Sequence, residues 1–215
     1  MIRGDKMIVI GVVENSRERN TFKLLKEMFS ISNYEVSYEN KMESMAILNQ
    51  DENHIMIIDI RPEKADSIEN IGIDFNILIH TFLKSVDYDN GSIKNMFRKS
   101  KYIIVNSDEE RWTSLLDNNV ESIAITYGFN NKATINPSSY NIHEVIEANI
   151  SFQRVIYTIL EEEIDPFELL MKINSRSKVD LYSGMATMAC SLILGMDLCL
   201  LNEVVEFKGR YMRQI

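Results

Sequence analysis

The residues with the clearest potential for chemistry lie in one short turn, residues 14–20, between a strand-like run and a helix-like run. In nucleotide-binding α/β proteins the corresponding turn is rich in glycine and holds a lysine, so that backbone amides and a cation surround a phosphate. This turn has no glycine after Gly11, and Glu18 places a carboxylate where such a cation would stand. Arg17 and Arg19 are candidates for holding an anion at the helix N-terminus. The alternative is a solvated turn whose acidic and basic side chains pair with one another.

Acidic side chains elsewhere offer a second candidate site. Asp59 lies near the end of a strand-like run, and Asp87 and Asp89 follow in a later loop, so these carboxylates are candidates for holding a divalent ion. The competing interpretation is that they are simply solvated. His54, His80 and His143 have no H-x-x-x-H or cysteine partner, which favours structural roles for all of them.

The two cysteines, Cys190 and Cys199, both fall in an apolar C-terminal region. Their spacing is not that of a metal knuckle, and no base is evident nearby. We therefore expect two free buried thiols rather than a disulfide, a metal site or a catalytic nucleophile.

The composition excludes several classes of function. The chain has 215 residues, of which 45% are hydrophobic and 26% charged, as is typical of a soluble globular domain. Its net charge of −9 argues against general binding to nucleic acid and against adsorption to an anionic membrane. No apolar run is long enough to span a bilayer, and the first residues lack a signal-peptide core, so we predict a cytoplasmic protein.

Strand-like and helix-like segments alternate along residues 1–130. The predicted strands are residues 7–13, 34–38, 54–60, 75–80, 102–105 and 122–127, and the predicted helices are residues 21–29, 42–49, 92–99 and 109–118. Because apolar strands alternate with helices, the expected fold is α/β, with a mostly parallel sheet and helices on both faces.

The pattern changes after residue 130. Residues 131–175 contain strand-like runs at 133–142 and 145–160, which predict a small antiparallel β add-on, and residues 167–173 fit either a strand or a helical turn. Residues 176–215 predict two C-terminal helices, at 180–194 and 198–207. No repeat or low-complexity linker interrupts the chain, so we expect a single domain over residues 1–215.

Six sequence phrases provide a resemblance to a known family. They are Ile10-Gly11-Val12, Gly72-Ile73-Asp74-Phe75-Asn76, Ile104-Val105-Asn106-Ser107-Asp108-Glu109, Thr126-Tyr127-Gly128-Phe129, Leu181-Tyr182-Ser183-Gly184-Met185-Ala186 and Phe207-Lys208-Gly209-Arg210. In this order they resemble the central, ATP-binding domain of the Mur ligases. Those enzymes use ATP to add amino acids to UDP-N-acetylmuramoyl precursors of peptidoglycan.

The resemblance also shows where this sequence departs from the family. The former phosphate loop corresponds to Gly11, Glu14, Arg17, Glu18 and Arg19. The lysine that contacts the phosphates corresponds to Glu18, and the magnesium-binding serine or threonine corresponds to Arg19. Both replacements oppose the binding of a triphosphate with its metal.

Other stations of the family site are altered as well. The adenine-side H-N-x-x-N passage reads Val179-Asp180-Leu181-Tyr182-Ser183. The exception is the metal-binding glutamate, which corresponds to Asp59, a shorter side chain that is still a candidate oxygen ligand. His80, Asn106 and Asp180 are expected at the former cleft. The family's flanking domains have no counterpart in this sequence.

The expected function follows from a retained scaffold with an altered site. The leading interpretation is a non-catalytic Mur ligase-like protein that acts by binding, through homo-oligomerisation or a protein partner, with no cofactor and a link to cell-wall precursor metabolism. We expect apolar segments such as residues 192–201 to expose apolar surface through which the chain pairs. The alternatives are a divergent ATP- and magnesium-dependent amide ligase, and a sensor of a small molecule or muropeptide.

Overall fold

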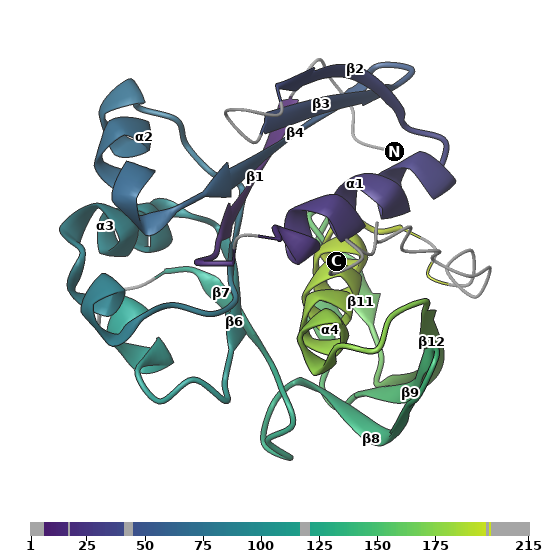
Figure 1. Ribbon diagram of the computed structural model, residues 1–215. Helices are drawn as coiled ribbons and strands as arrows, with labels where there is room; N and C mark the ends of the chain where they lie inside the picture. Colours follow the sequence, from purple (N-terminus) through teal and green to yellow (C-terminus); the bar gives the residue numbers. More distant parts are fainter. Residues whose placement is uncertain (1–6, 17, 41–44, 117–120, 197, 199–215) are drawn as a thin grey trace, which may run out of the picture.

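The computed structural model describes residues 7–16, 18–40, 45–116, 121–196 and 198. Its centre is a ten-stranded sheet with the strand order β12-β9-β8-β7-β6-β5-β1-β4-β3-β2 (Figure 1). The strands of this sheet are β1 (Met7–Val13), β2 (Glu35–Asn40), β3 (Met45–Gln50), β4 (Asn53–Ile60), β5 (Ile77–His80), β6 (Tyr102–Asn106), β7 (Ile123–Tyr127), β8 (Ile135–Ile142), β9 (Ile146–Phe152) and β12 (Phe167–Ile173). A separate antiparallel pair is formed by β10 (Ile156–Tyr157) and β11 (Glu163–Ile164).

The sheet is parallel in the middle and antiparallel at both ends. Strands β4, β1, β5, β6, β7 and β8 run parallel, although β8 joins β7 through one residue pair, Tyr127 with Ile135. Strands β2 and β3 extend one end, and β9 and β12 extend the other, through antiparallel pairings. The expected antiparallel part of residues 131–175 is therefore largely continuous with the main sheet.

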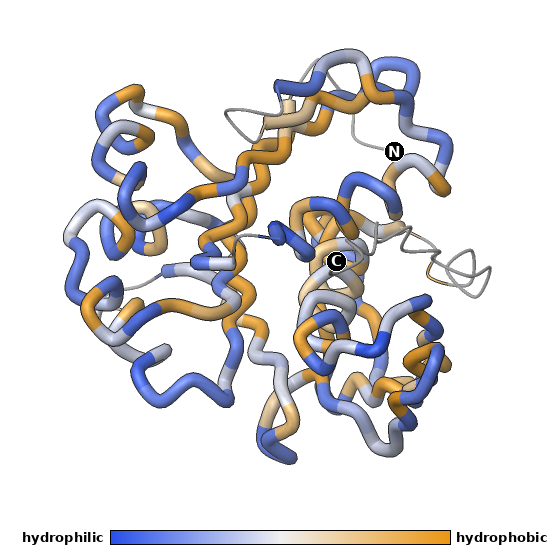
Figure 2. The backbone as a smooth tube through the Cα atoms, in the orientation of Figure 1, coloured by the Kyte–Doolittle hydropathy of each residue, from blue (hydrophilic) through white to orange (hydrophobic). Residues whose placement is uncertain are grey.

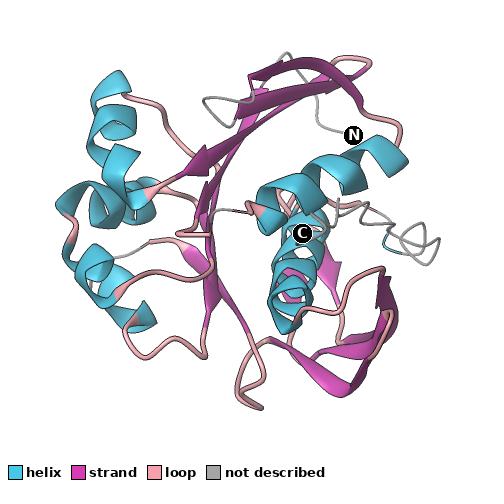
Figure 3. Cartoon of the chain, viewed as in Figure 1, coloured by secondary structure: helices cyan, strands magenta, loops and turns pink. Residues whose placement is uncertain are grey.

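Helices cover both faces of the sheet, as expected for an α/β fold (Figure 3). They are α1 (Asn20–Ile31), α2 (Ala65–Ile71), α3 (Gly91–Lys99) and α4 (Lys178–Ile193), with short 3-10 turns η1 (Pro62–Lys64), η2 (Ser85–Asp89) and η3 (Trp112–Leu115). In Figure 1, α1 and α4 lie on one side of the central strands and α2 and α3 on the other. None of the helices in the described ranges is long and apolar enough to cross a membrane.

Two apolar layers hold these helices against the sheet. One layer packs Phe22, Leu25 and Phe29 of α1 and most of α4 against the strands, and the other packs Phe97 and neighbouring side chains of α3. The central strands are correspondingly hydrophobic along their length (Figure 2). Because these strands are buried on both faces, they appear in the sequence as continuous apolar runs.

Several predicted elements differ from the structure. Residues 45–50 form strand β3 rather than part of a helix, because they pair along their whole length with β4. The helix expected at residues 109–118 is only the 3-10 turn η3 in the described residues, and α2 was not predicted. Residues 167–173 form a strand, and the helix expected at residues 198–207 lies, apart from Leu198, outside the described residues.

The apolar C-terminal segment does not provide the expected exposed surface in its described part. Leu192 and Ile193 belong to the core beneath the sheet, as does Leu198. Cys190 is buried on α4, and burial raises the pKa of its thiol well above the usual value, which is consistent with an inert thiol. Cys199 lies outside the described residues.

Candidate functional site

The carboxyl ends of the parallel strands meet at one edge of the sheet, and most of the predicted site residues lie there. Glu14 follows β1, Asp59 lies one residue before the end of β4, and His80 and Asn106 end β5 and β6. In open α/β sheets this edge is where ligands bind. We call these four residues, together with Asp180 of α4, the carboxyl-edge site.

Glu14 is the most unusual residue of the carboxyl-edge site, because its carboxyl group is buried in the turn. The residue is 2% exposed, and the backbone N–H of Phe22 donates a hydrogen bond to its side chain. Phe22 is the third residue of α1, so this N–H has no partner within the helix. The Oε1 atom of Glu14 has no hydrogen-bond partner in the described part of the chain.

The environment of Glu14 favours its neutral form. Burial, reinforced by the charge of Asp59, raises the pKa of Glu14 from 4.5 to about 8. Lys23 and Arg19 act in the opposite direction but do not outweigh burial. Glu14 is therefore protonated at neutral pH, and its carboxyl oxygen occupies a helix N–H that would otherwise be available to an anion.

Arg19 makes an ion pair across the start of α1. It is the N-cap residue, with left-handed φ and ψ of 53° and 45°, and its Nε atom lies 3.1 Å from Oδ2 of Asp59. The Asp59 side chain is 1% exposed, so this contact is largely shielded from water. One cation of the predicted anion site is thus engaged by a carboxylate, and the other, Arg17, lies outside the described residues.

Two other residues of the former phosphate loop have different roles from those expected. Glu18 is exposed, and its backbone N–H donates to Ser16 Oγ at 3.1 Å, so its carboxylate does not line the buried turn. Gly11 lies inside β1, where a Cβ atom would come within 2.5 Å of Leu78 Cδ1. Its glycine is explained by the close packing of side chains in the apolar layer that includes α3, rather than by a phosphate turn.

His80 belongs to a buried chain of polar groups. Its Nε2 atom lies 2.9 Å from the Tyr88 hydroxyl, which in turn donates to Glu109 Oε2 at 3.3 Å. Because that hydroxyl is the donor to Glu109, it accepts the Nε2 proton of His80. Burial lowers the pKa of His80 from 6.5 to about 3, so the imidazole is neutral and supplies no positive charge to the edge.

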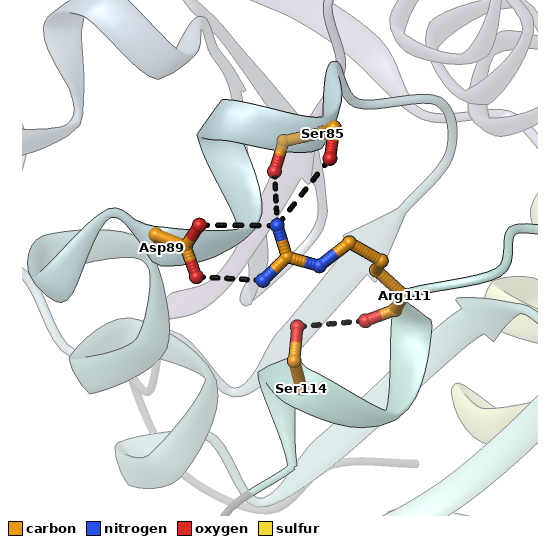
Figure 4. A network of polar contacts seen from close by, with 4 residues as sticks. All are labelled: Ser85, Asp89, Arg111 and Ser114. Carbon is orange, nitrogen blue, oxygen red and sulfur yellow. Dashed lines mark hydrogen bonds and ion pairs between the residues drawn. The ribbon is translucent and has the colours of Figure 1, made fainter.

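Arg111 forms a clamp with Ser85 and Asp89, the first and last residues of η2 (Figure 4). Tyr88 belongs to the same turn. The guanidinium donates to both carboxylate oxygens of Asp89, at 2.6 and 3.0 Å, and to the backbone oxygen of Ser85 at 2.6 Å. The hydroxyl of Ser114 donates to the backbone oxygen of Arg111 at 2.7 Å, which orders the other side of the clamp. Asp89 is therefore engaged in positioning η2 against η3.

The three candidate metal ligands are not brought together. Asp87 accepts hydrogen bonds from Asn15 Nδ2 at 3.1 Å and from the Lys84 N–H at 3.0 Å, while Asp89 pairs with Arg111. Asp59 lies with Arg19. No group of three His, Cys, Asp or Glu side chains that could hold a metal ion occurs in the described ranges.

Asn106 and Asp108 order the next part of the edge. Asn106 is fully buried, donates to the backbone oxygen of Thr81 at 3.3 Å, and accepts the N–H of Asp108 at 3.1 Å. Asp108 accepts the N–H of Phe129 at 2.6 Å and the hydroxyl of Tyr182 at 2.8 Å. The sequence analysis names Asp108 only as part of a family phrase and gives it no role, although its position two residues after an apolar strand is a usable signal.

Aromatic rings gather where α4 meets this edge. Tyr182 makes an edge contact with Phe82 and a tilted contact with Phe129, with ring centroids 5.1 Å apart in both cases. Lys178 Nζ lies 3.9 Å from the centroid of the Phe129 ring. The rings from three separate segments thus contact one another on the α4 side of the carboxyl edge.

Asp180 links the starts of α1 and α4. It accepts a hydrogen bond from Asn20 Nδ2 at 2.6 Å and another from the Ser175 hydroxyl. The neighbouring pair, Thr21 and Ser183, is joined by a hydroxyl hydrogen bond of 3.0 Å. Burial raises the pKa of Asp180, although both hydrogen bonds favour its charged form.

Comparison with solved structures identifies the fold. The chain superposes on a UDP-N-acetylmuramoylalanyl-D-glutamyl-2,6-diaminopimelate--D-alanyl-D-alanyl ligase from Acinetobacter baumannii with a TM-score of 0.69 and 8% identity, over 91% of this chain and 45% of the other. The chain has a Mur ligase-like fold. MurC, the UDP-N-acetylmuramate-alanine ligase of Thermotoga maritima, gives a TM-score of 0.63 at 13% identity, over 92% of this chain and 44% of that one.

The likeness extends to a pseudomurein ligase. A pseudomurein peptide ligase type C from Methanothermus fervidus gives a TM-score of 0.60 at 16% identity, over 92% of this chain and 48% of that one. No family model and no curated protein matches the sequence. This chain spans less than half the length of each of these ligases. Because the identities are so low, the comparisons show a shared Mur ligase-like fold.

Proposed function

We propose that this chain is a Mur ligase-like domain that no longer uses nucleotide and acts by binding, most simply by pairing with another protein chain. The observation that carries the proposal is the hydrogen bond from the backbone N–H of Phe22, which has no partner within α1, to the carboxyl group of Glu14. A phosphate at this turn would need that same N–H and the same space. The chain supplies its own acceptor instead.

Two neighbouring features support this reading. The Arg19 guanidinium, which would be needed to neutralise a bound anion, contacts Asp59 at 3.1 Å in a largely buried pair. A polyphosphate that displaced this contact would leave the Asp59 carboxylate buried beside it, at a cost of several kcal/mol. On the α4 side, Phe82 and Tyr182 contact each other near the passage that corresponds to the family's adenine-side motif. The residues present therefore do not fit a triphosphate and its metal.

The alternative function is a divergent ATP-dependent amide ligase. It is favoured by the overall fold, which is similar to enzymes described as ligases. It requires an ATP site at the carboxyl edge, so a test of nucleotide binding separates the two functions.

The test is a titration with Mg-ATP in which binding is measured by thermal unfolding and by isothermal calorimetry. A ligand present at a hundred times its dissociation constant stabilises a protein by about 2.7 kcal/mol, which thermal unfolding detects, and isothermal calorimetry measures the heat of binding itself. We expect no stabilisation and no binding heat. Saturable binding of Mg-ATP to the unaltered chain would refute the proposal and establish the ligase alternative as the better one.

A pair of variants tests the stated cause. Glu14→Ala removes the carboxyl group from α1, so tripolyphosphate is expected to bind the variant weakly but measurably. Glu18→Ala removes an exposed carboxylate from the same turn and is the matched control, for which we expect no gain. Equal gains in the two variants would mean that net charge, and not occupation of the Phe22 N–H, governs anion binding.

A further inference from the structure

The free edge of β12 has a sequence that is complementary to itself. Its seven residues read Phe167-Glu168-Leu169-Leu170-Met171-Lys172-Ile173. If two copies of the strand pair antiparallel about Leu170, Glu168 of each copy lies opposite Lys172 of the other. Leu170 lies opposite itself, and the remaining pairs are apolar. Opposite charges and apolar side chains placed directly across from each other stabilise antiparallel strands.

The edge is regular, and within the described residues no further strand pairs with it. Strand β12 is the last strand of the sheet at this end, and it pairs with β9 over all seven residues without a shift of register. It contains no proline or bulge of the kind that protects sheet edges. Its alternate backbone groups therefore face away from β9, where the described residues provide no further strand.

The opposite edge of the same sheet provides an internal comparison. Strand β2 carries an irregularity of register between Val36 and Tyr38 and contains two acidic residues, Glu35 and Glu39, with no basic one. When two copies of β2 pair about Ser37, Glu35 of each copy lies opposite Glu39 of the other, and Glu39 is already ion-paired with Lys26 of α1 at 2.6 Å. Only one of the two edges is suited to pairing with itself.

The side chains of β12 carry the groups for such pairing. Glu168 accepts a hydrogen bond from the Ser138 hydroxyl of β8 through Oε1, which leaves Oε2 for Lys172 of a second copy. Leu170 is 42% exposed on the outer face, between Glu168 and Lys172. Lys172 already pairs with Glu147 of β9 at 2.6 Å, so Glu168 of a second copy would extend an alternating ladder of charges across the sheet. An apolar hollow also follows the strand: it is lined by five successive residues of β12, residues 169–173, with Met28 of α1 and Met188 of α4. Because successive residues face opposite sides of a strand, a hollow that touches all five lies along its edge.

We propose that two copies of this chain associate through antiparallel pairing of β12, joining their sheets across a two-fold axis at Leu170. Such an interface is isologous, since each copy contributes the same surface. The inference specifies the binding surface for the proposed function and rests on that function being association rather than catalysis.

The test is sedimentation velocity over a range of protein concentrations, combined with charge reversal at the two ends of the strand. The unaltered chain is expected to form a dimer that dissociates on dilution. Glu168→Lys and Lys172→Glu each place like charges opposite each other in a homodimer, so each is expected to raise the dimer dissociation constant by about tenfold or more.

Recombining the two changes provides the decisive control. An equimolar mixture of the Glu168→Lys chain and the Lys172→Glu chain has complementary charges in the mixed pair, so we expect a heterodimer to form. The doubly substituted chain, Glu168→Lys with Lys172→Glu, is also expected to regain the homodimer. It lacks the contact of Lys172 with Glu147 just as the single variant does, so its recovery excludes damage to the folded monomer as the explanation. Far-ultraviolet circular dichroism verifies that every variant is folded.

Three results would overturn the interface: a monomer at every concentration, a dimer that ignores the single reversals, or failure of both the mixture and the double variant to recover pairing. None of these results bears on nucleotide use, which the Mg-ATP titration tests separately. A dimer that ignores the β12 variants would leave association as the function and place it on another surface.

Discussion

The buried carboxyl group of Glu14 predicts a specific dependence of stability on pH. Its pKa is about 8 in the folded chain and 4.5 ordinarily, so between these values the folded state holds a proton that the unfolded state has lost. The free energy of unfolding contributed by this group is therefore fully present below pH 4.5 and is lost as the pH rises through 8. Each pH unit corresponds to about 1.4 kcal/mol, so the whole window amounts to about 5 kcal/mol.

The substitution Glu14→Gln isolates this contribution. Glutamine keeps a carbonyl oxygen for the N–H of Phe22 but does not ionise in either state. We expect the variant and the unaltered chain to have similar unfolding free energies at pH 4, and the variant to be more stable by about 5 kcal/mol at pH 9. Urea denaturation at one-unit intervals from pH 4 to pH 9 measures the difference directly.

The control is Glu18→Gln, which neutralises an exposed carboxylate four residues away in the same turn. It is expected to leave the pH dependence of the unaltered chain in place. If the difference between Glu14→Gln and the unaltered chain were constant across this pH range, Glu14 would not be a buried, protonated group. Glu14 would then not be the neutral acceptor of the Phe22 N–H at the N-terminus of α1.

Two further predictions concern the packing around the site. Tyr88→Phe removes the acceptor of the buried His80 Nε2 proton and should lower the free energy of unfolding by about 1–3 kcal/mol, as measured by urea denaturation; an unchanged value would place the proton elsewhere. Gly184→Ala would bring a Cβ atom within 2.6 Å of Met171 Sδ and 2.7 Å of Ile173 Cδ1, so these side-chain ends must shift. Because alanine favours a helix by up to about 1 kcal/mol over glycine, the matched control is Gly91→Ala, which enters open space, and we expect Gly184→Ala to be the less stable of the two variants in thermal unfolding; equal stabilities would contradict the close packing.

The sequence was sufficient to predict the parallel core, because burial on both faces leaves a local signature. Strands β1 and β6 are apolar along nearly their whole length, β4 contains the apolar run of residues 55–58, and these patterns do not depend on distant contacts. Residues 45–50 were misassigned because a short run such as Met45-Ala46-Ile47-Leu48 suits either a helix or a strand. Pairing with β4 decides it, through a turn in which Asp51 adopts a φ of 52°.

The candidate site could be located from sequence but not assembled. The sequence identified the turn after β1 as unlike a phosphate loop, and it gave Glu18 as the decisive carboxylate. The structure instead buries Glu14 and exposes Glu18. That choice depends on the left-handed backbone of Arg19 and on its contact with Asp59, which is 40 residues further along the chain. Neither feature has a local sequence signal.

When a ligand site is lost and its scaffold is retained, the remaining side chains must satisfy the polar groups that the ligand would have bound. A helix that starts at the carboxyl edge of a sheet presents N–H groups without partners, and a bound phosphate would satisfy them. Under the proposed function no phosphate binds, so leaving those groups unpaired would cost about 1–3 kcal/mol for each one.

Glu14 supplies the missing acceptor to Phe22 from within the chain. Its elevated pKa follows from the same burial, since a neutral carboxyl group accepts a hydrogen bond without leaving an uncompensated charge beside Asp59. The buried acid is thus explained as the group that keeps α1 in place once the anion is absent, which is why removing it should both destabilise the turn and reopen it to phosphate.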